Sequence, residues 1–228
     1  MKKLIPFFAA ALCGLFASCA NVEVRVPPPS RMIADVDPVE LGELIVFTEK
    51  FFSSSLDKGT VTLFYNPRTD ELQMHYRNST GGKVQLHLSF EARKRFVDSF
   101  AEYNSLYENK TLKNTKNSAK AFGTSLAVLK WGGVMSLDAE GLALLEYGYA
   151  FKDGSPWYVL GVPVTQNEKY NEIEMNYSKN SSPRNFFFNR AKAAEFAALM
   201  DQATLEALVQ SPLVQDEIPD TLKTGDDY

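Results

Sequence analysis

The sequence predicts an α+β fold made of two β-β-β-β-α-like repeats, in which antiparallel sheets are each backed by a helix. The main observation is a strand–turn–strand–helix unit that occurs twice, with corresponding strands at 71–76 and 172–177. Apolar and polar residues alternate along these strands with period two, so one face of each sheet is expected to be buried. Each unit then continues into a segment with an apolar stripe at helical spacing.

The first repeat is expected over residues 41–120. Its strands are predicted at 43–52, 60–65, 71–76 and around Leu86 and Leu88. Ser89 is the expected N-cap of the helix, because its side-chain oxygen can accept from free backbone N–H groups of the first turn. The helix carries aromatic residues spaced four, three and four apart, namely Phe96, Phe100, Tyr103 and Tyr107.

The second repeat is expected over residues 121–211. A strand meander is predicted at 125–135, 142–151 and 157–164, followed by 172–177 and a strand that contains Phe186 and Phe188. Asn189 is the expected N-cap of one helix. The stripe of this helix repeats the spacing of the first repeat, with Phe196, Met200, Ala203 and Ala207.

This order resembles the β-β-β-β-α unit that is repeated in the Whirly and PUR-type single-strand nucleic-acid binders. The resemblance is one of topology, covers most of the body and implies a nucleic-acid partner. The formal net charge of the chain is −4, whereas general nucleic-acid binding requires a basic surface. We therefore expect no nucleic-acid partner.

Residues 1–18 have the pattern of an export signal peptide, with Lys2 and Lys3 before an apolar run of about 13 residues. That run is shorter than the roughly 20 residues of a membrane-spanning helix. Its end, Phe16-Ala17-Ser18-Cys19, resembles a lipobox, the site at which bacterial lipoproteins are cleaved and acylated. The resemblance implies cleavage between Ser18 and Cys19, palmitate on Cys19, and anchoring in the lipid bilayer of the cell envelope, with the outer membrane or the periplasmic face favoured.

The two cysteines of the chain agree with this hypothesis. Cys13 lies inside the predicted signal, so Cys19 would be the sole cysteine after cleavage, whereas exported domains otherwise use cysteines in pairs or avoid them. An alternative stays open. Small residues at Ser18 and Ala20 would also allow an ordinary signal peptidase to cut after Ala20, which would give a secreted, non-lipidated binding protein.

Two further segments are expected outside the repeats. Residues 19–40 contain Pro27-Pro28-Pro29 and Pro38 and are predicted to form an extended tether. Residues 212–228 are polar, end in Asp226-Asp227-Tyr228, and are predicted to be a disordered acidic tail.

His75 and His87 are the two histidines of the chain, and a short turn would place them directly opposite each other on neighbouring strands. A good metal site needs three or four ligands. The expected neighbours on that face, Gln73, Gln85 and Arg77, are poor ligands. We therefore expect no metal and no cofactor, and the simpler interpretation is two histidines on a solvated sheet face.

No catalytic motif is present, and a Gly-x-Ser-x-Gly elbow is absent. Paired carboxylates can hydrolyse glycosides, so an envelope-polymer hydrolase that uses acidic residues remains an alternative. The acidic residues in question are Glu172 with Glu174 and Asp138 with Glu140.

Two surface features have open interpretations. A basic loop with Lys110, Lys113, Lys116 and Lys120 would either keep the protein soluble or contact anionic lipid or a partner. The outward aromatic residues Phe64 and Phe187 would mark either packing between the two halves or a binding groove. Together the sequence predicts an envelope lipoprotein with a non-catalytic binding or scaffolding role, whose partner is an envelope protein or a small ligand.

Overall fold

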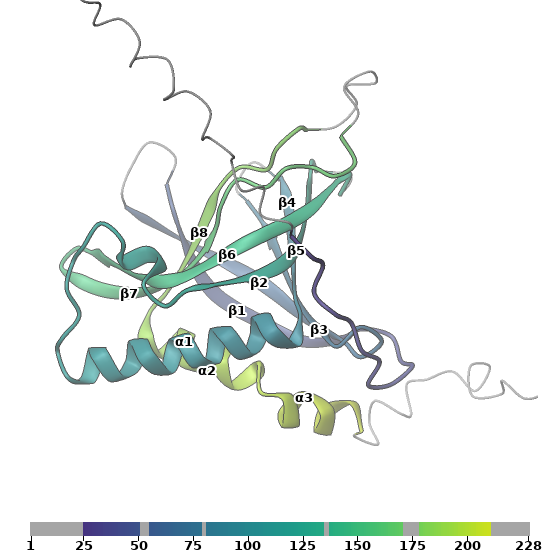
Figure 1. Cartoon of the computed structure of the whole chain (residues 1–228), viewed down its shortest axis with the longest axis horizontal. Helices are drawn as coiled ribbons and strands as arrows, with labels where there is room; N and C mark the ends of the chain where they lie inside the picture. Colours follow the sequence, from purple (N-terminus) through teal and green to yellow (C-terminus); the bar gives the residue numbers. More distant parts are fainter. Residues whose placement is uncertain (1–24, 51–54, 79–80, 135–136, 171–177, 211–228) are drawn as a thin grey trace, which may run out of the picture.

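Eight antiparallel strands form one closed barrel, in which each strand pairs with the next and β8 pairs with β1 (Figure 1). The computed structural model describes residues 25–50, 55–78, 81–134, 137–170 and 178–210. The strands are β1 Val39–Glu49, β2 Leu56–Asn66, β3 Glu71–Arg77, β4 Lys83–Leu88, β5 Thr124–Gly132, β6 Ala139–Lys152, β7 Ser155–Val162 and β8 Arg184–Phe188.

The prediction of an α+β fold with two helix-backed sheets is wrong. The edge strands of the two predicted sheets pair with each other: β4 pairs with β5, as at Leu86 opposite Leu129, and β1 pairs with β8 at Phe47 opposite Phe187. An unpaired strand edge leaves N–H and C=O groups without partners, and closure of the barrel removes both edges at once. Alternation along a strand shows which face is buried, but it does not show which edges join.

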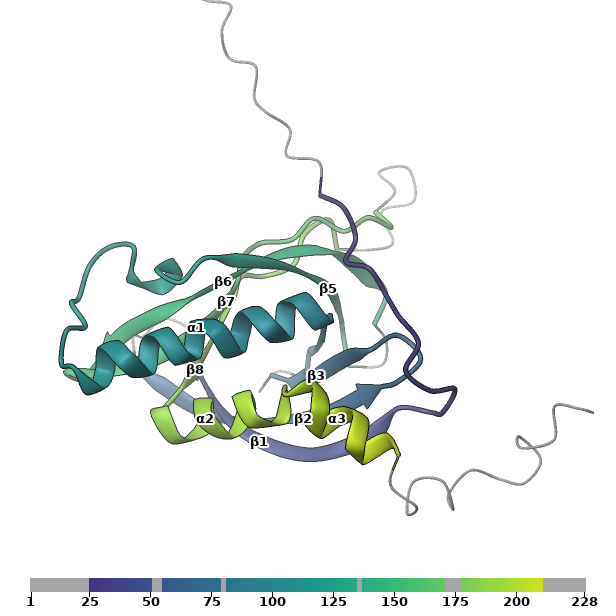
Figure 2. The same cartoon turned by 60° about the horizontal axis from the view of Figure 1, so that its bottom comes forward.

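The helices cover one end of the barrel. They are α1 Phe90–Glu108 after β4, and α2 Arg190–Leu199 and α3 Gln202–Val209 after β8; a short 3-10 turn, η1 Ser118–Lys120, follows α1. Figure 2 shows α1 and α2 side by side across the opening. We call this the helix end. Because β4 and β8 run toward it, these two strands start at the opposite end, which we call the mouth.

The capping predictions are confirmed at both helix starts. The side chains of Ser89 and Asn189 accept from the backbone N–H groups of Ala92 and Lys192, respectively. The second helix differs from the prediction, because it stops at Met200 and restarts after Asp201, whose side chain accepts from the N–H of Thr204. This break rotates the apolar face, so that Leu205 and Val209 are buried in place of Ala203 and Ala207.

The core fills the barrel from the helix end. Phe96 of α1 is fully buried, and its ring lies 5.1 Å from that of Tyr158 and 4.9 Å from that of Phe196. Both contacts are edge-to-face, the geometry that aromatic pairs prefer. Aliphatic side chains that point inward from the strands complete this cluster. The helices therefore close this end of the barrel.

The first described residues run along the outside of the barrel wall. Arg25 Nη1 donates to the carbonyl of Leu142, close to the start of β6, and the N–H of Ile33 donates to the carbonyl of Pro67 at the helix end. Ile33 also packs on a small cluster formed with α3. The described part of the predicted tether thus contacts the barrel, while residues 1–18 and 212–228 lie outside the described residues. None of the described helices is long and apolar enough to cross a membrane.

Candidate functional site

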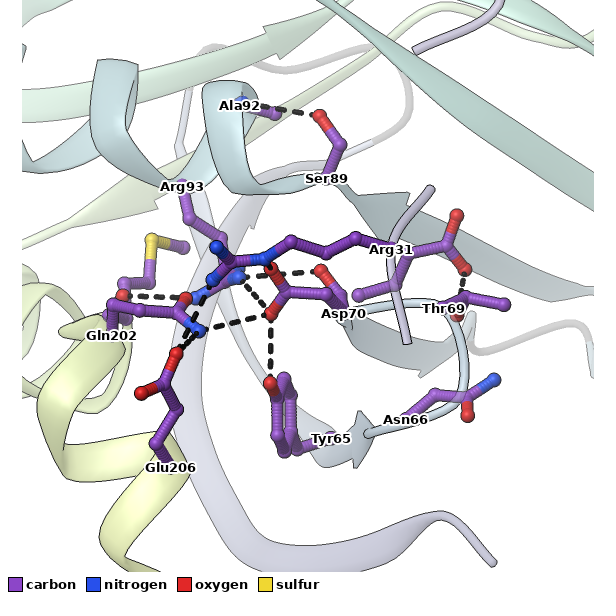
Figure 3. Close-up of polar contacts among 12 residues, drawn as sticks. Arg31, Tyr65, Asn66, Thr69, Asp70, Ser89, Ala92, Arg93, Gln202 and Glu206 are labelled. Carbon is purple, nitrogen blue, oxygen red and sulfur yellow. Dashed lines mark hydrogen bonds and ion pairs between the residues drawn. The ribbon is translucent and has the colours of Figure 1, made fainter. Parts of the chain in front are cut away.

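A buried ion pair between Asp70 and Arg93 lies at the helix end of the barrel (Figure 3). Asp70 is 2% exposed and Arg93 is 1% exposed. Asp70 Oδ1 accepts from Arg93 Nη2 at 2.6 Å and from the Tyr65 hydroxyl at 2.7 Å, and Oδ2 accepts from Arg31 Nε at 2.7 Å. Both carboxylate oxygens are therefore bonded to protein donors.

This cluster joins four parts of the chain. Asp70 ends the turn between β2 and β3 with a φ of 53°, a left-handed conformation that Asp tolerates better than most residues. Arg93 lies in the first turn of α1 and also donates to the carbonyl of Met200, where α2 ends. Burial, together with the hydrogen bond to Asp70, raises the pKa of Tyr65 well above its usual value. The arrangement leaves no oxygen of Asp70 for a substrate and has the properties of a structural cluster.

A pocket opens at the mouth, at the opposite end of the barrel. Its empty volume is about 530 Å³, counting the part open to solvent. Inward-facing apolar side chains from β4, β5, β7 and β8 line its floor: Val84, Leu129, Trp131, Val162 and Phe186. Trp131 is 8% exposed, and its Nε1 is buried with no hydrogen-bond partner in the described structure.

Two cationic side chains, Arg184 and Lys83, line this pocket. Arg184, the first residue of β8, lines it and places its guanidinium carbon 4.9 Å from the centre of the Tyr76 ring. Lys83 also lines it and lies opposite Arg77 across the β3–β4 pair. Within the described ranges, neither Arg184, Lys83 nor Arg77 has a carboxylate within 4.0 Å.

The acidic residue Glu140, at the start of β6, is itself paired with lysines. Its carboxylate lies 2.9 Å from Lys169 Nζ and 4.0 Å from Lys130 Nζ. The hydrogen bond from Lys169 is the main cause that lowers the pKa of Glu140. Its charge is therefore already compensated on the outer face of the sheet. Of the other predicted acidic residues, Asp138 lies just before β6, and Glu172 and Glu174 lie outside the described residues.

The two histidines are not directly opposite each other. His75 pairs with Gln85, and His87 pairs with Gln73, so the prediction was displaced by two residues. The reason is the hairpin turn: the N–H of Asn78 donates to the carbonyl of Gly82, and the N–H of Gly82 donates to the Asn78 side chain. The centre of the turn therefore lies one residue earlier in the chain than predicted, which shifts the cross-strand pairing by two residues.

Each histidine has its own local contacts. His75 Nε2 lies 3.2 Å from Gln73 Oε1, and the His75 ring lies 4.6 Å from that of Phe64. His87 Nδ1 lies 3.3 Å from Glu71 Oε2. Burial, and then the charge of His87, lowers the pKa of His75. No group of three or more His, Cys, Asp or Glu side chains in the described ranges is placed to hold a metal ion.

The remaining predicted surface residues lie away from the mouth pocket. Phe187 is 2% exposed and faces Phe47 where β8 closes onto β1, with Lys152 Nζ 5.2 Å from its ring. The four lysines of the basic loop are exposed on the connection from α1 to β5: Lys110, Lys113, Lys116 and Lys120. Cys19 lies outside the described residues.

Sequence reasoning missed the residues of both sites, although each carried a signal. Arg93 lies three residues before Phe96 and therefore belongs to the apolar stripe of α1. Arg184 has the same strand parity as Phe186 and Phe188, which marks it as an inward-facing cation. A charged residue at a position that the pattern assigns to the core is the observation that would have identified both.

A family model described as "Uncharacterised Treponema protein" matches residues 38–207. An uncharacterized protein of Treponema pallidum (strain Nichols) is 23% identical over 192 residues, which is 82% of this chain. The chain spans about 65% of the length of that curated relative. No solved structure matches the chain significantly.

Proposed function

The chain belongs to the family of uncharacterised Treponema proteins, and we propose that it is an envelope lipoprotein with a non-catalytic binding role. The observation that carries this proposal is Cys19, the sole cysteine after the predicted signal, preceded by Phe16-Ala17-Ser18. Acylation there would attach the barrel to the bilayer, since two acyl chains are sufficient for stable anchoring.

The position of Arg25 supports an orientation for the anchored barrel. Arg25 donates a hydrogen bond to the carbonyl of Leu142, near the mouth end of β6. Arg25 lies six positions after Cys19 in the sequence. Six residues span at most about 20 Å. An acylated Cys19 would therefore hold the bilayer on the side of the mouth and leave the helices facing away from it.

The electrostatics favour binding over hydrolysis. A glycosidase needs a carboxylic acid whose pKa is raised, so that it can donate a proton. The pKa of Glu140 is lowered instead, by Lys169, and the Asp70 carboxylate is buried with protein donors on both oxygens. These residues are thus placed as ion-pair partners.

The proposal is tested with the full chain expressed in a bacterium that carries the lipoprotein pathway. We expect the wild-type protein in the membrane fraction, with the mass of an acylated N-terminus that begins at Cys19. The Cys19→Ala variant should lose both the acyl mass and the membrane association. Cys13→Ala is the matched control and should behave as the wild type, because Cys13 lies inside the predicted signal.

Three results would contradict the proposal. An unmodified mature N-terminus at Asn21 would identify a secreted, non-lipidated protein cut after Ala20. Membrane association that is equal in wild type and Cys19→Ala, with no acyl mass in either, would show that the thiol is not the anchor. The same purified protein, incubated with envelope polysaccharide, should release no reducing ends; release of reducing ends would favour the hydrolase alternative.

A further inference from the structure

We propose that the mouth pocket binds a small anionic amphiphile, a molecule that carries one carboxylate or phosphate group next to a compact apolar group. The inference deepens the proposed binding role by assigning it a site and a ligand class. It rests on three properties that the pocket has among the described residues: an apolar floor, cations without carboxylate partners, and a buried donor without an acceptor.

The apolar floor defines one part of the ligand. Leu129, Trp131 and Phe186 point inward from β5 and β8 and line the pocket above the filled core. Burying an apolar group against such side chains is favourable because it removes apolar surface from water. Because the core below is packed from the helix end, the space suits a short chain or a single ring and does not suit a long acyl chain inserted along the barrel axis.

The cations define the other part. Arg184 lies at the pocket wall, where the Tyr76 ring supports its guanidinium, and Lys83 lies on the neighbouring wall. A planar guanidinium that is held in place can bind a carboxylate or phosphate with two hydrogen bonds. Neither cation has a carboxylate partner in the described structure, so an anion that enters the pocket does not have to displace any of the described carboxylates.

The indole of Trp131 supplies the third property. Buried polar groups are normally hydrogen-bonded, and those that are not call for an explanation. Trp131 lines the pocket, and its Nε1 is buried without a partner in the part of the chain that the structure describes. A ligand oxygen at the pocket floor would be an acceptor for this donor.

The test uses Trp131 as the reporter. The chain contains two tryptophans, so the full chain with Trp157→Phe leaves Trp131 as the only indole, and Cys19→Ala keeps lipidation out of the measurement. We expect octanoate and octyl phosphate to change its fluorescence saturably. Octanol, octyltrimethylammonium and inorganic phosphate should each bind at least about tenfold more weakly, because each lacks one of the two groups or has the wrong charge.

Variants of the cations test the assignment of the anion site. Arg184→Gln should weaken octanoate binding by about tenfold or more, since it removes charge-assisted hydrogen bonds. Lys83→Gln should weaken it by about two- to fivefold, because a partly exposed point charge contributes less. The matched control is Arg190→Gln, which removes an arginine that also stacks on a tyrosine, at 5.1 Å from the Tyr107 ring, but at the helix end. It should leave binding unchanged.

Several outcomes would overturn the inference. Octanol binding as tightly as octanoate would remove the role of the anion, and inorganic phosphate binding as tightly as octyl phosphate would remove the role of the apolar floor. Unchanged octanoate affinity in Arg184→Gln, with circular dichroism and a melting temperature like those of the parent, would remove the arginine site.

A preference for octyl phosphate over octanoate would support a lipid-headgroup ligand, and the reverse would support a free carboxylic acid. Because lipidation is absent throughout, these results are independent of the Cys19 experiment.

Discussion

At the scale of single residues, the Asp70–Arg93 pair is the feature whose removal should cost the most stability. Both side chains are almost fully buried, and the pair is completed by Tyr65 and Arg31. Removing one member of a buried ion pair leaves the other charge desolvated, which typically costs about 3–5 kcal/mol. The exposed members of such clusters contribute much less, because water screens them.

We therefore expect Arg93→Met to lower the free energy of unfolding by about 3–5 kcal/mol. Arg31→Gln should lower it far less, since the Arg31 side chain is 52% exposed and water screens its charge. Urea unfolding followed by circular dichroism measures both values. Arg190→Met is the matched control, because Arg190 pairs with Glu108 at the surface. If Arg93→Met and Arg190→Met cost the same, the buried pair does not determine stability.

A second prediction for the same pair separates charge from packing. Asp70→Asn keeps a residue that tolerates the left-handed conformation at this turn, where φ is 53°. In the double variant with Arg93→Met, no unpaired buried charge remains of this pair, so part of the loss in Arg93→Met should be recovered. If the loss of unfolding free energy in the double variant equals the sum of the losses in the two single variants, the two residues do not interact.

At the scale of elements, the β3–β4 hairpin shows what the sequence can and cannot specify. Alternation assigned the inward residues of both strands correctly, including Leu72, Met74, Leu86 and Leu88. The predicted register of the two strands is displaced, because register depends on which residues form the turn. The position of the turn is fixed by the Asn78 side chain, which accepts from the N–H of Gly82, and not by the glycines alone. The break before α3 also depends on a single side chain. Asp201 lies within the continuous apolar stripe, and as the N-cap of α3 it starts a new helix there.

The hairpin should also give the stability of the protein a pH dependence. Burial lowers the pKa of His75 in the folded state, and the charge of His87 lowers it further. The unfolded chain then binds a proton at His75 before the folded chain does, so the free energy of unfolding should fall as the pH drops below about 6.5. Urea unfolding at pH 7.5, 6.5 and 5.5 measures the slope.

His75→Gln is the matched variant for this prediction, because Gln keeps a polar side chain but does not titrate. The variant should show a smaller loss of stability between pH 7.5 and 5.5 than the wild type. The pKa of His75 itself, followed by NMR of the folded protein, should lie below that of a histidine in a model peptide. Equal slopes in the two proteins would assign the pH dependence to other groups.

At the scale of the whole molecule, closure of the barrel is the property that the sequence did not reveal. The caps of α1 and α2 and most inward positions of the described strands follow from local pattern. The predicted strand at 172–177, on which the second copy of the repeat depends, lies outside the described residues. Local pattern does not show whether each set of four strands forms its own sheet. The pairs β4–β5 and β8–β1 decide this, and they join residues that are far apart in the chain, such as Phe47 and Phe187.

This closure predicts that neither predicted repeat folds alone. Residues 41–120 would expose the edges of β1 and β4, and residues 121–211 would expose those of β5 and β8. Phe96 of α1 would also lose its contacts with Tyr158 and Phe196, which belong to the second half.

Each half expressed separately should therefore show no cooperative thermal unfolding by circular dichroism, whereas the full chain should unfold in one transition. Mixing the two halves should restore part of the cooperative signal, because their edges are complementary. A cooperative transition in the first half alone would mean that its four strands and helix are an independent unit, and that closure onto the second half is not what stabilises them.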